Sequence, residues 1–91
     1  MDLTELREQI NGVDAQLKEL FLRRMELAAQ VAAYKKANGL PVLNAAREQQ
    51  VLETAAAGLE PPLDEYVRQL FAQMMALSRD YQRRLGAEEQ P

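Results

Sequence analysis

Residues 3–38 read LTELREQINGVDAQLKELFLRRMELAAQVAAYKKAN, and this stretch decides the fold class. Apart from a break at position 24, apolar side chains recur in it at steps of three and four, at Leu3, Leu6, Ile10, Val13, Leu17, Leu20, Leu27, Val31 and Tyr34. This spacing predicts one face of an α-helix, because a strand would alternate at every second residue. Asn38, Gly39 and Pro41 supply the stop signals, so we predict one helix of about 36 residues.

A helix of this length does not fit inside a compact chain of 91 residues. At ~1.5 Å per residue it is roughly 54 Å long, whereas a compact globule of this size has a radius of gyration of about 12 Å. The helix must therefore extend beyond its own protomer and carry its apolar seam with it. Pairing of two long helices around a two-fold axis would cover the seam, so we predict an intertwined helical homodimer.

Two shorter helices are predicted after the long one. Asn44 is a good N-cap for a helix that ends at Gly58. Pro62 fits the first position of a third helix, whose apolar residues recur at helical spacing from Leu63 to Leu85. The sequence therefore predicts an all-α fold with three helices per protomer, the first of them very long.

The domain boundaries follow from the end of this pattern. We expect one helical domain over residues 1–86 and a polar tail or the start of a linker over residues 87–91, where no periodic signal remains. No stretch approaches the ~18 apolar residues of a membrane span, and the acidic start lacks the basic region of a signal peptide. We therefore expect a cytoplasmic protein without membrane association.

The composition excludes several classes of function. The chain has no cysteine and no histidine, which removes disulfides, thiol nucleophiles, and the commonest metal ligand and general base. Its net charge of -3 argues against a nucleic-acid partner, since phosphate backbones attract basic surfaces.

Arg24 stands where the apolar seam calls for leucine or valine, so its charge is directed toward the interior. Lys35 follows close to three turns later, on nearly the same face and about 16 Å along the axis. Two long cations in this arrangement could hold one small anion between them. The alternative is a coiled-coil specificity device, or an arginine whose charged end reaches back to solvent.

Ser78 and Gln82 are stacked one turn apart in a stripe beside the main seam of the third helix. Because a buried amide without partners costs ~1 to 3 kcal/mol, we expect Gln82 to meet a ligand, a water or another side chain. An ordinary interhelical hydrogen bond is the alternative. At the start of the second helix, Glu48 suits the positive end of the helix dipole beside Arg47, although most such pairs are simply solvated.

Arg7 lies about 25 Å from Arg24 along the first helix, too far for both to hold one small molecule. An antiparallel dimer changes this separation. If the helices cross near residue 19, position 7 of one chain falls opposite roughly position 31 of the other. Arg7, Arg24 and Lys35 could then converge on one anionic ligand across the interface.

The motifs along the chain together resemble the all-helical chorismate mutases. The matching residues, spread over about residues 3–83, are Leu6-Arg7-Glu8-x-Ile10, Asp14, Arg24-Met25-Glu26-Leu27-Ala28, Val31, Lys35, Pro41-Val42, Arg47-Glu48, Leu70-Phe71 and Ser78-x-x-x-Gln82. The resemblance implies a three-helix protomer in an intertwined homodimer. It also implies an isomerase that converts chorismate to prephenate, in the part of the shikimate pathway that leads to phenylalanine and tyrosine, with no metal or organic cofactor.

The resemblance further implies which residues bind the reacting part of the substrate. Arg7 from one chain and Arg24 from the other would bind the two substrate carboxylates. Lys35 would reach both a carboxylate and the ether oxygen, and Gln82 would donate to the same oxygen. Lys35 and Gln82 are thus the predicted catalytic residues.

Four more residues complete the site that the resemblance implies. Glu48, helped by the backbone of Arg47, would take the substrate hydroxyl, and Ser78 would support the carboxylate end. Asn44 departs from the aspartate that close relatives often have near the hydroxyl, but it still offers an acceptor and caps its helix.

Two other functions remain open at this point. Isochorismate pyruvate-lyase shares the fold and the cationic clamp, although Glu48 after Arg47 and the intact Ser78 and Gln82 favour the mutase. A non-catalytic helical dimerisation or regulatory module is the second alternative. The domain could also be fused to, or associate with, another enzyme of the aromatic pathway.

Overall fold

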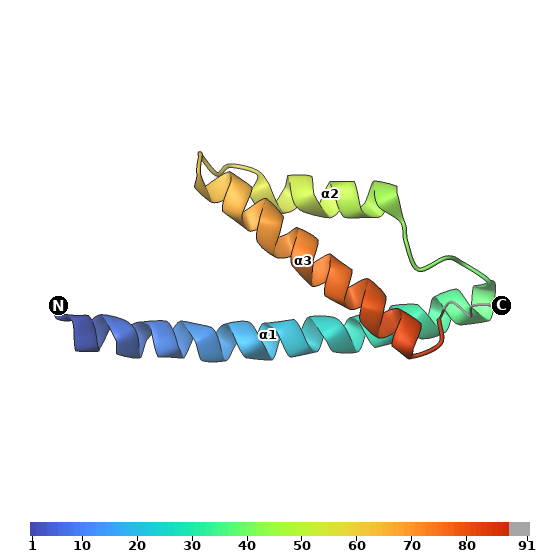
Figure 1. Cartoon of the computed structure of the whole chain (residues 1–91), viewed down its shortest axis with the longest axis horizontal. Helices are drawn as coiled ribbons and strands as arrows, with labels where there is room; N and C mark the ends of the chain where they lie inside the picture. Colours follow the sequence, from blue (N-terminus) through green and yellow to red (C-terminus); the bar gives the residue numbers. More distant parts are fainter. Residues whose placement is uncertain (88–91) are drawn as a thin grey trace.

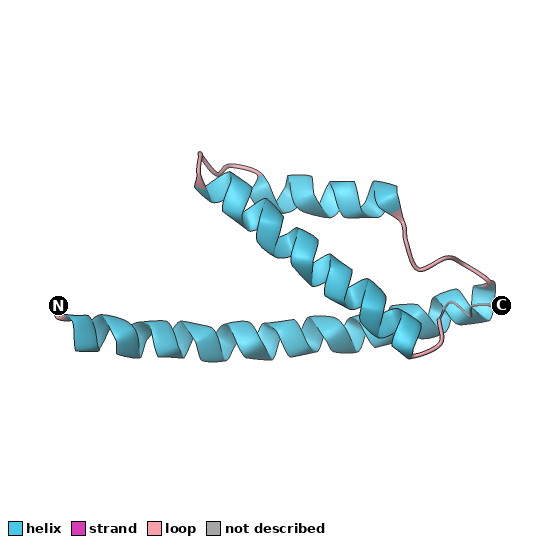
Figure 2. Ribbon diagram, in the orientation of Figure 1, coloured by secondary structure: helices cyan, strands magenta, loops and turns pink. Residues whose placement is uncertain are grey.

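The computed structural model describes residues 1–87 as three α-helices, with no strand among them (Figure 2). Helix α1 spans Leu3–Asn38, α2 spans Ala45–Ala56 and α3 spans Leu63–Arg84. The predicted all-α fold is confirmed, and so is the length of the first helix, at 36 residues. Residues 88–91, most of the predicted tail, lie outside the described part of the chain.

Helix α1 ends and α2 begins at the signals in the sequence, whereas α2 ends at Ala56, two residues before the predicted Gly58. Gly39, with φ of 64°, ends α1 and donates its N–H to the carbonyl of Lys35. This left-handed conformation costs glycine little, because glycine has no Cβ. Asn44 is the N-cap of α2, as predicted, and its Oδ1 accepts from the N–H of Arg47 at 3.0 Å.

Helix α3 begins one residue later than predicted. Pro62 is the N-cap residue rather than the first helical residue, since its φ and ψ of -90° and 2° depart from helical values. Its carbonyl accepts from the N–H of Tyr66 at 3.1 Å, which is the first bond of the helical ladder. The prediction missed this step because proline is compatible with both positions.

The three helices form an open triangle with one long side (Figure 1). Helix α3 crosses the C-terminal half of α1, and α2 packs along α3. The N-terminal half of α1 extends away from both, so the described chain measures 56 × 25 × 18 Å with a radius of gyration of 16.4 Å. The predicted extension of α1 beyond a compact protomer is confirmed.

Most buried residues lie where α3 meets the C-terminal half of α1, and one more, Ala56, lies at the end of α2. Ala28 and Ala32 are buried on α1 and Met75 on α3, because alanine lets two helix backbones approach closely. Val42 from the loop and Ala87, just after α3, complete a small cluster with Ala32. No helix in residues 1–87 is long and apolar enough to cross a membrane.

Candidate active site

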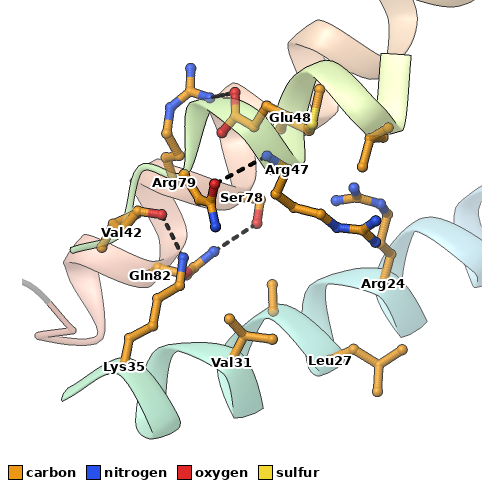
Figure 3. A pocket seen from close by; sticks show the side chains of 14 residues that line it. Arg24, Leu27, Val31, Lys35, Val42, Arg47, Glu48, Ser78, Arg79 and Gln82 are labelled. Atoms are coloured by element: carbon orange, nitrogen blue, oxygen red, sulfur yellow. Dashed lines mark hydrogen bonds and ion pairs between the residues drawn. The ribbon is translucent and has the colours of Figure 1, made fainter. Parts of the chain in front are cut away.

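A pocket of about 300 Å³ lies between α1 and α2, with α3 forming its back wall (Figure 3). Its volume is at the lower end of the range for small-molecule sites. Its polar lining consists of Arg24, Lys35, Asn44, Arg47, Glu48, Ser78, Arg79 and Gln82. The apolar lining is Leu27, Ala28, Val31, Val42, Val51 and Met75. All the predicted site residues except Arg7 therefore share one pocket.

Helix α1 supplies two cations to this pocket. Arg24 and Lys35 both line it and are half-buried, with Leu27 and Val31 between them on the same face. Lys35 Nζ donates to the carbonyl oxygen of Val42 at 2.6 Å, so the loop after α1 fixes its position. Helical spacing thus brings these two charges to the lining of one pocket.

Ser78 and Gln82 form the buried polar wall on α3. Their exposed fractions are 7% and 6%, and Gln82 Nε2 donates to Ser78 Oγ at 3.1 Å. This bond lies within one helix, so the alternative of an interhelical hydrogen bond is wrong. Gln82 Oε1 is buried and has no hydrogen-bond partner among the described residues 1–87. An unpartnered buried amide oxygen is costly, and it is typical of a group that meets a ligand or water.

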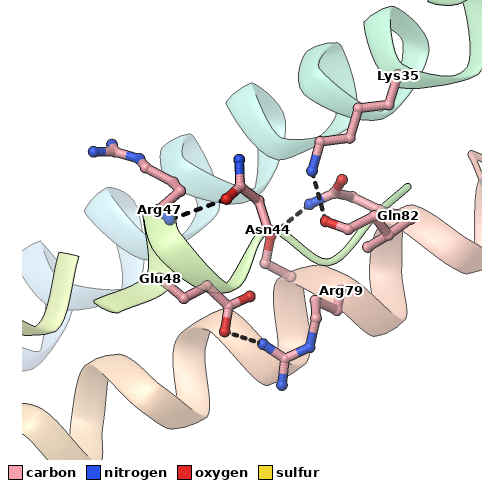
Figure 4. A network of polar contacts seen from close by, with 8 residues as sticks. Lys35, Asn44, Arg47, Glu48, Arg79 and Gln82 are labelled. Carbon is pink, nitrogen blue, oxygen red and sulfur yellow. Dashed lines mark hydrogen bonds and ion pairs between the residues drawn. The ribbon is translucent and has the colours of Figure 1, made fainter. Parts of the chain in front are cut away.

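The start of α2 forms the opposite wall (Figure 4). Asn44 Oδ1 accepts a hydrogen bond from the backbone N–H of Arg47. The resemblance had assigned this N–H to the substrate hydroxyl. The Arg47 guanidinium donates to Gln50 Oε1 at 2.9 Å. Glu48 is half-buried and forms an ion pair with Arg79 of α3, so it is not simply solvated.

Sequence reasoning missed Arg79. It lies next to Ser78 and three residues before Gln82, so its position on the α3 stripe was the signal that could have found it. With Arg79, the pocket has four cationic side chains and one carboxylate. Although the whole chain is acidic, this pocket favours a small anion with more than one negative charge.

Arg7 does not reach the pocket within one protomer. It is exposed on the N-terminal half of α1, on the part of the helix that extends away from α2 and α3. No group of three or more carboxylate side chains that could hold a metal ion occurs within residues 1–87.

Comparison with known proteins identifies the family of this fold and pocket. The chain matches the chorismate mutase type II family over residues 6–83. This chain belongs to that family. The family assignment made from sequence motifs, that of an all-helical chorismate mutase, is confirmed.

Two curated relatives share the same region with the chain. The T-protein of Enterobacter agglomerans is 41% identical over 71 residues, which cover 72% of this chain and 19% of that protein. The T-protein of Haemophilus influenzae is 36% identical over 74 residues, which cover 76% of this chain and 20% of that protein. The chain thus spans about a fifth of the length of each relative. No solved structure gave a significant match.

Proposed function

We propose that this chain is a chorismate mutase, which rearranges chorismate to prephenate in the cytoplasm, and that it acts as a homodimer. The observation that carries the proposal is the convergence of Arg24, Lys35 and Arg47 with Gln82 in one pocket. These residues come from three helices, and the family match covers all of them.

The reaction explains why such a pocket needs neither histidine nor cysteine. The rearrangement is unimolecular, since one C–O bond breaks as one C–C bond forms, and no nucleophile or general base takes part. The enzyme must instead hold a dicarboxylate in its folded, near-attack conformation. Arginine and lysine side chains bind carboxylates through charge-assisted hydrogen bonds, which gives Arg24 and Lys35 this role.

Negative charge develops on the ether oxygen as the C–O bond breaks. Lys35 and Gln82 lie at the same end of the pocket and both carry N–H donors (Figure 3). The Ser78 hydroxyl can either accept or donate, so the Gln82 amide can turn an N–H toward a ligand and still keep its bond to Ser78. Fixed donors aimed at a developing charge stabilise the transition state more than the substrate.

The substrate hydroxyl is assigned to the α2 wall. Glu48 supplies a carboxylate oxygen there, and Asn44 lies beside it on the pocket surface. Ser78 supports the carboxylate end of the substrate from α3.

The dimer is part of the same proposal. Leu6, Ile10 and Leu17 of the α1 seam are 44%, 56% and 54% exposed, an apolar surface that a second copy would cover. Antiparallel pairing of two α1 helices brings the partner's Arg7 toward the pocket, where it would complete the carboxylate clamp. Association with another aromatic-pathway enzyme also belongs to this proposal, since the chain spans only a fifth of its relatives.

The direct test is an assay of the purified chain with chorismate, following both chorismate loss and prephenate formation. We expect prephenate to form without added metal or cofactor. Parallel incubation with isochorismate tests the lyase alternative, in which pyruvate is released from that substrate and chorismate is unchanged. No turnover of either compound by a folded dimer would overturn the enzyme proposal in favour of a dimerisation module.

The shared site is tested by mixing two inactive variants. Arg7→Ala and Arg24→Ala chains refolded together should form heterodimers in which one of the two sites keeps both arginines. With random pairing, activity should recover to about a quarter of that of the parent. Activity no higher than that of either variant alone would contradict the contribution of Arg7 in trans.

A further inference from the structure

Arg79 is the cationic residue of the pocket to which the proposed function gives no role. Its Nη1 pairs with Glu48 Oε1 and so joins the middle of α3 to the first turn of α2. Both side chains are half-buried, with exposed fractions of 26% and 24%. Figure 4 shows the pair between the start of α2 and α3.

The position of the Glu48 carboxylate matters because of its neighbours in the pocket. A glutamate has three side-chain torsions and reaches several places when nothing holds it. Arg24, Lys35 and Arg47 line the same pocket, and an unrestrained carboxylate would pair with one of them. Such a pair would occupy a cation that the substrate carboxylates need.

The hydrogen bond of Asn44 affects which group at the α2 wall can accept from the substrate hydroxyl. Asn44 Oδ1 accepts from the N–H of Arg47 as the helix cap, so this oxygen is already engaged. Arg79 contacts Oε1 of Glu48, and among the described residues 1–87 no hydrogen bond or ion pair engages Oε2. Asn44 Oδ1 keeps one lone pair, but Glu48 Oε2 is charged and is therefore the stronger acceptor at this wall for a hydroxyl.

We propose that Arg79 is a positioning residue, which holds Glu48 so that Oε2 faces the substrate hydroxyl and the carboxylate stays away from the cationic clamp. This inference rests on the proposed mutase function. Arg79 acts through Glu48 and not by touching the substrate, which sets it apart from Arg24 and Lys35.

The test is a double-mutant cycle measured by steady-state kinetics with chorismate, using Arg79→Gln, Glu48→Gln and the double variant. Arg79→Gln alone should lower kcat/KM by roughly 10-fold to 100-fold, the usual effect of a misplaced binding group. In the Glu48→Gln background the same change should cost less than about 2-fold, because the two residues act as one unit.

A substrate analogue separates positioning from a general structural effect. With a chorismate analogue that lacks the ring hydroxyl, Oε2 has no partner, so Arg79→Gln should change kcat/KM by less than about 2-fold relative to the parent. A merely structural loss would lower turnover of both substrates equally.

The matched control is Arg84→Gln on the same helix. Arg84 Nε pairs with Asp80 Oδ2 at 2.7 Å, but both side chains are exposed, so this variant removes an ion pair outside the pocket. It should leave kcat and KM unchanged.

Thermal unfolding and size-exclusion chromatography check that every variant folds. If Arg79→Gln is unstable, Arg79→Lys replaces it, and this variant should retain part of the activity because it keeps a positive charge near Glu48.

The outcomes distinguish a failure of the Arg79 positioning role from a failure of the proposed mutase function. An active parent with an unaffected Arg79→Gln variant overturns the positioning role alone. A loss that persists in full in the Glu48→Gln background, or with the analogue, also overturns it, because Arg79 would then act independently of Glu48 and the hydroxyl. A parent that does not convert chorismate overturns the proposed function and this inference with it.

Discussion

The two halves of α1 carry the same heptad seam but differ in what covers them. All of residues 1–20 are exposed, including large apolar side chains such as Val13 at 54% and Leu20 at 62%. In the C-terminal half the seam residues Leu27 and Val31 are still 52% and 44% exposed, but Ala28 and Ala32, beside the seam, are only 7% and 2% exposed because α3 packs on them. The protomer core of α1 therefore lies beside the apolar seam, at two alanines that the seam periodicity does not single out.

The residue types on the two halves explain the difference. The C-terminal half uses alanine where α3 crosses and places Arg24 and Lys35 toward the pocket. In the N-terminal half no residue up to position 20 is buried, and the large aliphatic residues of its seam bury more area against a partner than alanine would. We infer that the covered half determines the protomer and its site, and that the uncovered half determines association.

The largest effect is expected from a charge in the uncovered half. Leu17→Asp places a carboxylate in the proposed α1 interface, and the two-fold axis repeats it, so the desolvation cost counts twice. We expect the dimer and the mutase activity both to be lost, as measured by analytical ultracentrifugation and the chorismate assay. The control is Ala15→Asp, which adds the same charge on the opposite face of the helix and should leave the dimer intact.

A smaller effect, on catalysis and not on dimer formation, is expected from a substitution in the C-terminal half of α1. Lys35→Ala removes a donor at the ether oxygen without removing core volume, so the dimer should persist while kcat falls by about 100-fold to 1,000-fold. Lys18→Ala, a lysine on the same helix outside the pocket, should behave like the parent. A rise in KM with unchanged kcat would show that Lys35 only binds substrate.

The variant Gln82→Glu tests whether Gln82, on the α3 wall of the pocket, donates to the reacting ether oxygen. A carboxyl group donates only when it is protonated, and the nearby Lys35 ammonium lowers the pKa of the introduced carboxyl. Activity at about pH 7.5 should therefore fall by roughly 100-fold and recover as the pH is lowered. A pH profile parallel to that of the parent between about pH 5 and 8 would show that Gln82 does not contact the reacting oxygen.

The smallest effects are expected from alanine substitutions at two glycines, one in each half of α1. One substitution should raise the free energy of unfolding and the other should lower it. Gly12 lies inside the uncovered helix and a Cβ there meets nothing within 4 Å in the protomer, so Gly12→Ala should add up to about 1 kcal/mol of stability. Gly39 has φ of 64°, so Gly39→Ala should cost about 1 to 2 kcal/mol. Urea unfolding measures both, and a stabilising Gly39→Ala would contradict the strained cap.

The sequence by itself determined the local structure of this protein. The bounds of α1, the Asn44 cap and the break at Arg24 could all be predicted, because caps, glycine stops and heptad spacing act within a few residues. The same spacing brought Arg24 and Lys35 to one face. Family motifs then joined Asn44, Arg47, Glu48, Ser78 and Gln82 to the same site, which no local rule could have done, but they did not include Arg79.

Only the tertiary structure decided which side chains meet across helices. Nothing in the spacing of Glu48 and Arg79, which are 31 residues apart, predicts their ion pair, because it depends on how α2 packs against α3. The bond from Lys35 to the Val42 carbonyl likewise depends on the path of the loop. Helical periodicity sets the direction of each side chain around its own axis, whereas the contacts that build a site depend on how the axes cross.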